Sequence, residues 1–182
     1  ANRVLTKLDI CGNKMATKET GKALSDALAA NSILRELNVS NNNWHEGIWM
    51  GHIGDGPGFV QELAIGLGTN EALTRLDVSS NKMITNETGK ALGRALAQNK
   101  TLTVLDLSSN MWERRHYYPT CAEGDGFARD IALGLHANET LVSVNLLYNR
   151  IGVDQACQLA TTLEKHPTLR SLCGNMGDET DL

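Results

Sequence analysis

One stretch of the chain gathers side chains that are able to bind a metal ion or a partner. It holds His45, Trp49, Met50 and His52, with Glu46 among them. Imidazole and carboxylate groups ligate metals, but this spacing matches no compact metal-binding motif. Tryptophan, by contrast, is enriched among the residues that dominate binding at protein interfaces. We therefore expect these residues to contact a protein partner and expect no metal site.

A second stretch carries Arg114, Arg115, His116, Tyr117 and Tyr118. Arginine and tyrosine are typical of interface hot spots, so we expect this stretch to contact the same partner. The first stretch has an alternative, a loop packed on its own isoleucines. The alternative for the second is a solvated turn in which arginine stacks on tyrosine.

Acids and amides form a third set, placed between apolar residues: Asp9, Asn38, Asp77, Asp106 and Asn145. Alternation along a strand would put all of them on one exposed face of a sheet. There Asp77 and Asp106 either receive basic groups of a partner or belong to a repeat consensus that faces water. The sequence has no phosphate-binding glycine loop and no nucleophile elbow, and we expect no catalytic residue and no cofactor.

These side chains are positioned by repeated copies of the frame L-x-x-L-x-[LVI]-x-x-N. Five copies start at residues 5, 34, 73, 102 and 141, and a degenerate sixth starts near residue 169. The frame predicts a short strand with one buried face. Its asparagine can bond backbone groups where the chain turns away from the sheet. The position two residues after the asparagine is apolar in all five copies and should face the core: Met15, Trp44, Met83, Trp112 and Ile151.

Helical patterns follow the strands, at residues 19–30, 87–98, 126–135 and 153–164. Their apolar residues share one face at helical spacing. The residues expected on these faces are Ala23, Leu24, Ala27, Leu28, Ala91, Leu92, Ala95, Leu96, Phe127, Ile131, Leu135, Ala156, Leu159, Ala160 and Leu163. An asparagine follows four helices, where we expect a left-handed backbone: Asn31, Asn70, Asn99 and Asn138. One strand and one helix cannot bury an apolar face alone, so the units should stack into a solenoid.

The frame and the stretch NRIGVDQACQLATTLEKHPTLRSL at 149–172 resemble leucine-rich repeats, most closely the ribonuclease-inhibitor-like subclass. NOD-like receptors and the Ran GTPase-activating proteins share that subclass. The resemblance covers essentially residues 1–182 and implies a single α/β domain. It implies a right-handed solenoid shaped as a horseshoe arc, with short parallel strands on the concave face and helices on the convex face. The fold alone names no function, because it hosts many unrelated partners.

The repeat starts alternate between intervals of 29 and 39 residues before a last interval of 28. Residues 5–31 and 73–99 are near copies, and 55–73 matches 123–141, so the unit of duplication is a pair of repeats. The extra length of each long unit lies at 43–56 and 111–124, directly after the strand. We therefore expect two neighbouring loops at one edge of the solenoid, and these loops contain the two aromatic stretches.

The composition narrows the class of protein further. A net charge of −4 over 182 residues gives no electrostatic footprint for nucleic acid. No apolar run approaches the length of a membrane span. The four cysteines have neither zinc-site spacing nor the density of a disulfide framework. We therefore expect a cytoplasmic protein, although export is not excluded.

Together these observations predict a non-catalytic recognition or scaffolding module. It would bind a protein partner through the concave face and the loops 43–56 and 111–124. The alternative is an activator of a small GTPase, with Arg114 or Arg150 as a cation supplied in trans. The repeat runs to both ends without a polar cap, so we expect a fragment of a longer protein or end-to-end self-association.

Overall fold

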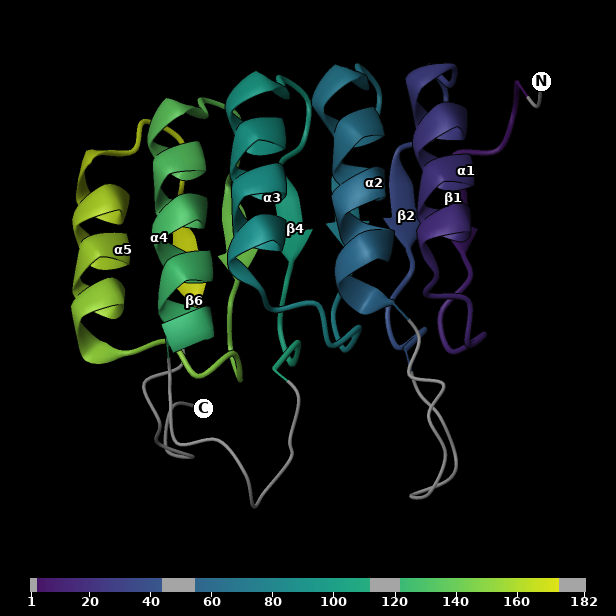
Figure 1. Ribbon diagram of the computed structural model, residues 1–182. Coiled ribbons are helices and arrows are strands. Elements are labelled where there is room, and N and C mark those ends of the chain that lie inside the picture. The colour runs from purple at the N-terminus through teal and green to yellow at the C-terminus, as the bar shows by residue number, and fades with distance from the viewer. Residues whose placement is uncertain (1–2, 44–54, 112–121, 174–182) are drawn as a thin grey trace, which may run out of the picture.

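The computed structural model describes residues 3–43, 55–111 and 122–173. Within these ranges, strands and helices alternate along the chain (Figure 1). The strands are β1 (Lys7–Asp9), β2 (Glu36–Asn38), β3 (Arg75–Asp77), β4 (Val104–Asp106), β5 (Ser143–Asn145) and β6 (Ser171–Cys173). The helices are α1 (Lys18–Ala29), α2 (Gly56–Thr69), α3 (Asn86–Gln98), α4 (Ala122–Ala137) and α5 (Val153–Lys165). No described helix is long and apolar enough to cross a membrane.

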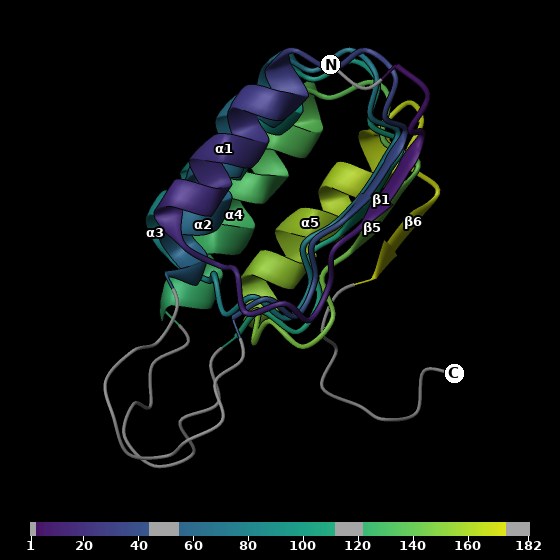
Figure 2. The ribbon, with the colours of Figure 1, turned by 90° about the vertical axis from the view of Figure 1, so that its right-hand side faces the viewer.

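The strands form one parallel sheet in the order β1-β2-β3-β4-β5-β6. Each strand is paired in register with the next, so equivalent positions of all the repeats lie in rows across the sheet. The helices cover one side of the sheet and leave the other side open (Figure 2). Adjacent strands lie ~4.8 Å apart and packed helices ~8–10 Å apart, so the open side is the concave one. The predicted α/β solenoid is confirmed.

The core lies between the sheet and the helices, and the repeat frame supplies most of it. Its third apolar anchor is fully buried in four repeats, at Val39, Val78, Leu107 and Leu146. The helices add large buried side chains, with Phe59 on α2 and Phe127 on α4. The predicted column after the asparagine is buried at Met83 and Ile151 and half-buried at Met15. Trp44 and Trp112 of that column lie outside the described residues.

The frame asparagines form a ladder at the carboxyl ends of the strands, which we call the strand-end ladder. Asn81 is representative: its Nδ2 donates to Val78 O in its own repeat and to Val39 O in the preceding one, both at 3.0 Å. Its Oδ1 accepts the N–H of Asn42 at 2.9 Å. The predicted role of this asparagine in the turn is confirmed, and the ladder also joins each repeat to the next.

A second ladder lies at the other end of the repeats, where each helix ends. Asn70 Nδ2 donates to Leu28 O of the preceding repeat at 2.7 Å, while its Oδ1 accepts the N–H of Leu73 at 2.6 Å. Asn99 and Asn138 repeat this pattern. The predicted left-handed backbone is wrong for these asparagines. Asn70 and Asn99 are extended, because this backbone lets the side chain bridge the helix end and the next strand.

The predicted helix faces are correct on α3 and α4 and partly wrong at the ends of the helix row. Ala91 and Ala95 of α3 are at least half-buried, whereas their counterparts in α1, Ala23 and Ala27, are exposed. Ala160 of α5 is exposed as well. The helical pattern alone did not reveal that α1 has a neighbour on one side only among the described elements.

Neighbouring helices differ in how closely they approach, because glycines recur in the paired units. A Cβ at Gly21 of α1 would collide with the carbonyl of Phe59 on α2. A Cβ at the equivalent Gly89 of α3 would lie 2.7 Å from Phe127 Cα on α4. Each short unit is therefore packed backbone to backbone against the long unit that follows it. The two-repeat period of the sequence is thus visible in the packing.

Candidate functional site

The concave face is formed by the first and third residues of each strand, whose side chains point away from the helices. The middle residue of each strand points into the core, as Leu76 and Leu105 show. In the third position, Asp77 of β3 is the register partner of Asp106 of β4. The predicted acid and amide column therefore exists as a continuous row, and its two central members are neighbouring carboxylates.

Each member of this row makes the same local turn. Asp77 Oδ1 accepts the N–H of Ser79 at 2.9 Å, and Asn38 Oδ1 accepts the N–H of Ser40 at 3.0 Å. Asp106 Oδ1 accepts from both the N–H and the hydroxyl of Ser108. The turn thus requires an oxygen acceptor and does not require a negative charge.

Amide groups neutralise the outer part of the row but leave its centre acidic. Asn38 Nδ2 donates to Asp9 Oδ2, and Asn145 Nδ2 donates to Asp106 Oδ2, both at 3.1 Å. Asp77 receives no such bond. Neither Asp77 nor Asp106 has an ion-pair partner in the described part of the chain. Two neighbouring carboxylates with unused acceptor positions are suited to receive an ammonium or guanidinium group.

The neighbouring rows of the concave face are mostly polar. Lys7 and Glu36 form an exposed ion pair at 3.2 Å. Hydrogen bonds from Cys11, first its backbone N–H, hold the pKa of Asp9 below its usual value. The same carboxylate raises the pKa of the Cys11 thiol, which disfavours the reactive thiolate. This edge of the face is therefore poorly suited to cysteine chemistry.

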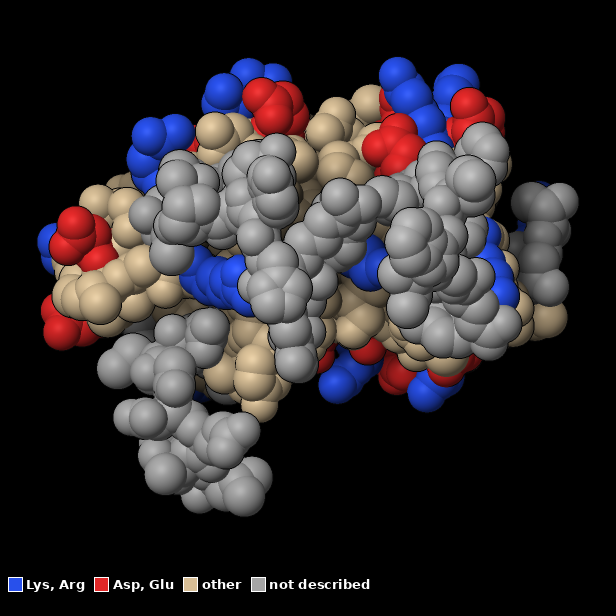
Figure 3. Space-filling view, turned by 60° about the horizontal axis from the view of Figure 1, so that its bottom comes forward, with Lys and Arg blue, Asp and Glu red and all other residues tan. Residues whose placement is uncertain are grey.

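The edge at which the strands end and the helices begin has basic groups that we did not single out from the sequence. Figure 3 shows this edge, where Lys and Arg side chains are exposed beside the residues that are not described. In each short unit the residue after the ladder asparagine is basic and left-handed: Lys14, Lys82 and Arg150. Tyr148, also left-handed, is 64% exposed beside them. The repeated Asn-Lys or Asn-Arg dipeptide was the available sequence signal.

Both ends of the loop 43–56 are fixed at this same edge. Asn43 Nδ2 donates to Asn81 O at 2.9 Å, and Gly56 lies against the same carbonyl. Asp55 caps α2 by accepting the N–H of Gly58 at 2.7 Å. The base of the loop is therefore closed and held against the next repeat.

The predicted contact residues of the loops lie outside the described residues, so their placement remains a prediction. They are His45, Trp49, Met50, His52, Arg114, Arg115, His116, Tyr117 and Tyr118. Of the predicted site residues, the structure therefore places Asp77 and Asp106 and brings these two together. Within residues 3–43, 55–111 and 122–173, no group of histidine, cysteine, aspartate and glutamate has the arrangement of a metal site.

Comparisons with known proteins agree with this architecture. The profile of a family described as Leucine Rich repeat matches residues 69–93 and 98–110. Among solved structures, actin-binding site 2 of leiomodin-1 is similar with a TM-score of 0.63 and 24% identity, over 88% of this chain and 79% of that chain. The tropomodulin C-terminal domain of Caenorhabditis elegans is similar with a TM-score of 0.64 and 18% identity, over 90% of this chain and 85% of that chain.

Curated protein sequences give no significant match. At these identities the two structural similarities concern the fold. The in-register parallel strands, the asparagine ladder and the profile match all fall on the same repeat frame. The chain is therefore a leucine-rich repeat protein.

Proposed function

We propose that this chain is a protein-recognition module that holds a basic segment of its partner against the concave face. The observation that carries the proposal is the pair of neighbouring carboxylates, Asp77 and Asp106, at the centre of the sheet. A basic side chain placed between them would accept two charge-assisted hydrogen bonds and relieve the repulsion of the carboxylates.

The repeats themselves argue that this pair is not required by the fold. Asn38 and Asn145 occupy the same position in neighbouring strands and make the same turn to the backbone. An uncharged amide thus satisfies the local structure. The two central carboxylates concentrate negative charge where an arc-shaped molecule would surround a partner, which favours a role in binding.

The loops 43–56 and 111–124 extend this surface in our proposal, with Trp49, Arg115 and Tyr117 among the contacts. Support comes from the edge they share, where the base of the first loop is fixed and where Tyr148 and Arg150 are placed beside the sheet. A partner that reaches this edge would meet basic and aromatic groups, while the part inside the arc would meet acidic ones.

Actin is the first partner to test, because leiomodin-1, whose actin-binding site 2 has this fold, is described as binding it. The similarity makes actin a probe and does not transfer the activity to this chain. The alternative of a GTPase activator gains no support from either structural similarity, so we do not develop it.

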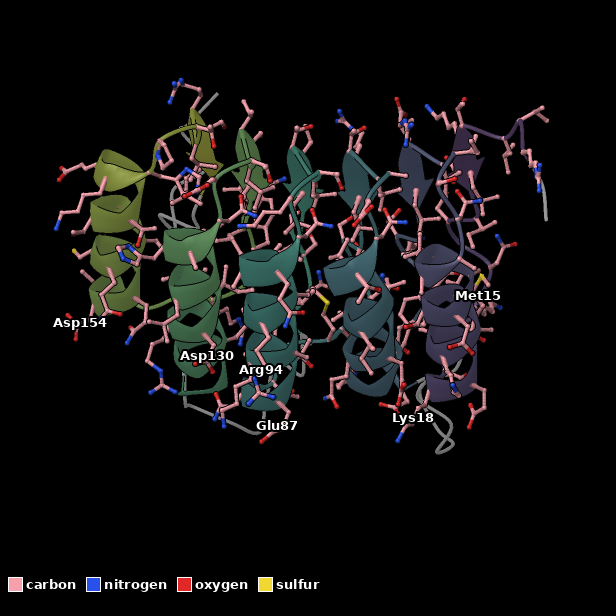
Figure 4. The ribbon with its side chains drawn as sticks, turned by 90° about the horizontal axis from the view of Figure 1, so that it is seen from above. Met15, Lys18, Glu87, Arg94, Asp130 and Asp154 are labelled. Atoms are coloured by element: carbon pink, nitrogen blue, oxygen red, sulfur yellow. The ribbon has the colours of Figure 1, made fainter. Side chains whose placement is uncertain are left out.

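The test compares three forms of the protein as bait: the natural chain, the double variant Asp77→Asn with Asp106→Asn, and a control with Asp26→Asn and Glu87→Gln. The control also removes two charges, but from the exposed outer side of the helices (Figure 4 labels Glu87). Purified monomeric and filamentous actin are tested first, and proteins captured from a cell extract are then quantified. We expect the natural chain and the control to retain a partner that the double variant loses.

Equal retention by the double variant and the natural chain would contradict the role of the carboxylate pair. The loop contribution is tested separately by replacing Trp49, Arg114, Arg115 and Tyr117 with alanine. We expect this variant to lose the partner with an unchanged circular dichroism spectrum. Undiminished binding would remove the loops from the proposed surface.

A further inference from the structure

The first repeat ends the sheet and the helix row on one side, and Figure 2 looks onto this end, with α1 and β1 nearest the viewer. We call the surface formed by β1, Asn13, Ala23, Ala27 and Asn31 the first-repeat face. Three independent sets of groups on it can be compared with their counterparts at internal junctions of the solenoid. The comparison is possible because the short unit 5–31 recurs at 73–99.

The helix side of this face has the shape of a helix interface. In α3, Ala95 packs against α2, and a Cβ at Gly68 of α2 would lie 3.5 Å from Ala95 Cα. The counterpart of Ala95 in α1 is Ala27, which is exposed together with Ala23. The small flat surface that receives α2 at an internal junction is thus present on α1, with no helix beside it among the described elements.

Both asparagine ladders reach this face with bonding groups unused. Asn42 Nδ2 donates to Ile10 O of the preceding repeat and its Oδ1 accepts from Asn13, whereas Asn13 Nδ2 bonds only within its own repeat and its Oδ1 accepts nothing. Asn31 Oδ1 is bonded to Leu34 N, but its Nδ2 has no acceptor in the described chain. The equivalent Nδ2 of Asn70 donates to the helix of the preceding repeat.

The sheet edge agrees with the ladders. Glu36 N–H of β2 donates to Thr6 O of the preceding repeat at 3.0 Å, and Asn38 O accepts from Ile10 N at 2.9 Å. The counterparts in β1 are Lys7 N–H and Asp9 O, on the edge of β1 away from β2. A strand added there in register would meet donors and acceptors in the order used by every internal junction.

Sterics determine which kind of unit fits this face. At junctions where a long unit follows a short one, Gly66 of α2 lies against the backbone of Ser25, and a Cβ there would collide with the Ser25 carbonyl. The residue of α1 at the position of Gly66 is Ala27. A short unit stacked before α1 would therefore bring its Ser25 counterpart into the Ala27 Cβ, while a long unit would bring a glycine like Gly68.

We infer that the first-repeat face is a docking surface for a leucine-rich repeat of the long type, with a helix like α2. The inference is independent of the function proposed for the concave face. It also disfavours docking of α5 from a second copy, because α5 belongs to a short unit. The occupant must supply a strand, a strand-end asparagine and a helix with a glycine at the place of closest approach.

The test adds one more unit to the protein, directly before Leu5. One extended chain carries an extra copy of residues 34–72, the long unit, and the matched control carries an extra copy of residues 5–33, the short unit. Hydrogen exchange of peptides that cover β1 is then compared with that of the natural chain. We expect the added long unit to slow exchange in β1 by at least about tenfold, and the added short unit to leave it unchanged.

Two variants separate docking from a general effect of the extension. Ala27→Gly should allow the added short unit to dock, because it removes the colliding Cβ. Ala27→Leu should abolish the protection given by the long unit, while the natural chain, in which Ala27 is exposed, tolerates it. Equal protection by both extensions, or by neither, would overturn the inference. Protection of β1 that rises with the concentration of the unextended chain would instead assign the face to a second copy.

Discussion

Replacing Asn81 with alanine should destabilise the protein far more than the same change at Asn13. Both residues occupy the same position of the frame, but Asn81 is fully buried inside the strand-end ladder and Asn13 is exposed at its end. Asn81→Ala would leave the N–H of Asn42 without its acceptor and would remove one donor from the carbonyls of Val39 and Val78.

The magnitude follows from what each group keeps. Val39 O still accepts from Asn42 Nδ2 and Val78 O from Asn110 Nδ2, so each loses one bond of about 1 kcal/mol. The buried N–H of Asn42 becomes an orphan, at about 2 kcal/mol. The loss should be about 4 kcal/mol in total. At Asn13 only exposed bonds within one repeat are lost, at about 1 kcal/mol or less.

Urea unfolding followed by circular dichroism measures both losses under one condition. We expect the free energies of unfolding of the two variants to differ by about 3 kcal/mol, which is a large part of the stability of a small domain. Equal losses would mean that the ladder does not join the repeats energetically, and the reasoning from buried bonds would be refuted.

Two further predictions concern packing and pH. Gly89→Ala should cost about 2 kcal/mol because its Cβ would press on the backbone of Phe127, whereas Gly68→Ala, which meets mainly the end of the Gln98 side chain, should be neutral or slightly stabilising. Melting temperatures decide this, and equal effects would contradict the close approach of α3 and α4. His166 takes the asparagine position of the second ladder, and its Nδ1 accepts the N–H of Leu169 at 2.9 Å. Burial first, and then the charges of Arg170 and His136, lower the pKa of His166, against the effect of the carbonyls of Leu135 and Asn138. The unfolded chain therefore takes up the proton more readily, so stability should be flat above about pH 6.5 and fall below it. His166→Asn should remove this part of the acid sensitivity in urea titrations at about pH 7.5 and about pH 5.5, and an unchanged pH dependence would contradict it.

The repeat frame predicted the architecture because each of its residues has one structural role. The alternation of Leu76, Asp77 and Val78 placed two side chains in the core and one on the open face, and the structure confirms this. Asn81 was expected to bond the turn, and it does so across two repeats.

Other features depend on neighbours that one repeat does not reveal. Ala27 has the same helical spacing as Ala95, yet it is exposed because no described helix lies on its outer side. Asn99 was expected to be left-handed from its place after a helix, but the bond from its Nδ2 to the preceding repeat requires an extended backbone. Cross-repeat bonds of this kind leave no periodic signal within one unit.

The candidate site was predictable in part. The row that contains Asp77 and Asp106 followed from strand alternation. That these two carboxylates remain without an amide donor between them depends on where Asn38 and Asn145 point, which the sequence does not specify. Tyr148 was overlooked because its position is occupied by small or polar residues in the other repeats.

The central claim is that the carboxylate pair of the concave face binds a basic segment of a protein. The most direct measurement is the Kd of a captured partner for the natural chain and for the Asp77→Asn, Asp106→Asn variant, at low and at physiological ionic strength. We predict a loss of at least about tenfold for the variant at low salt, and a smaller difference at higher salt. Equal Kd values at low salt would contradict the claim.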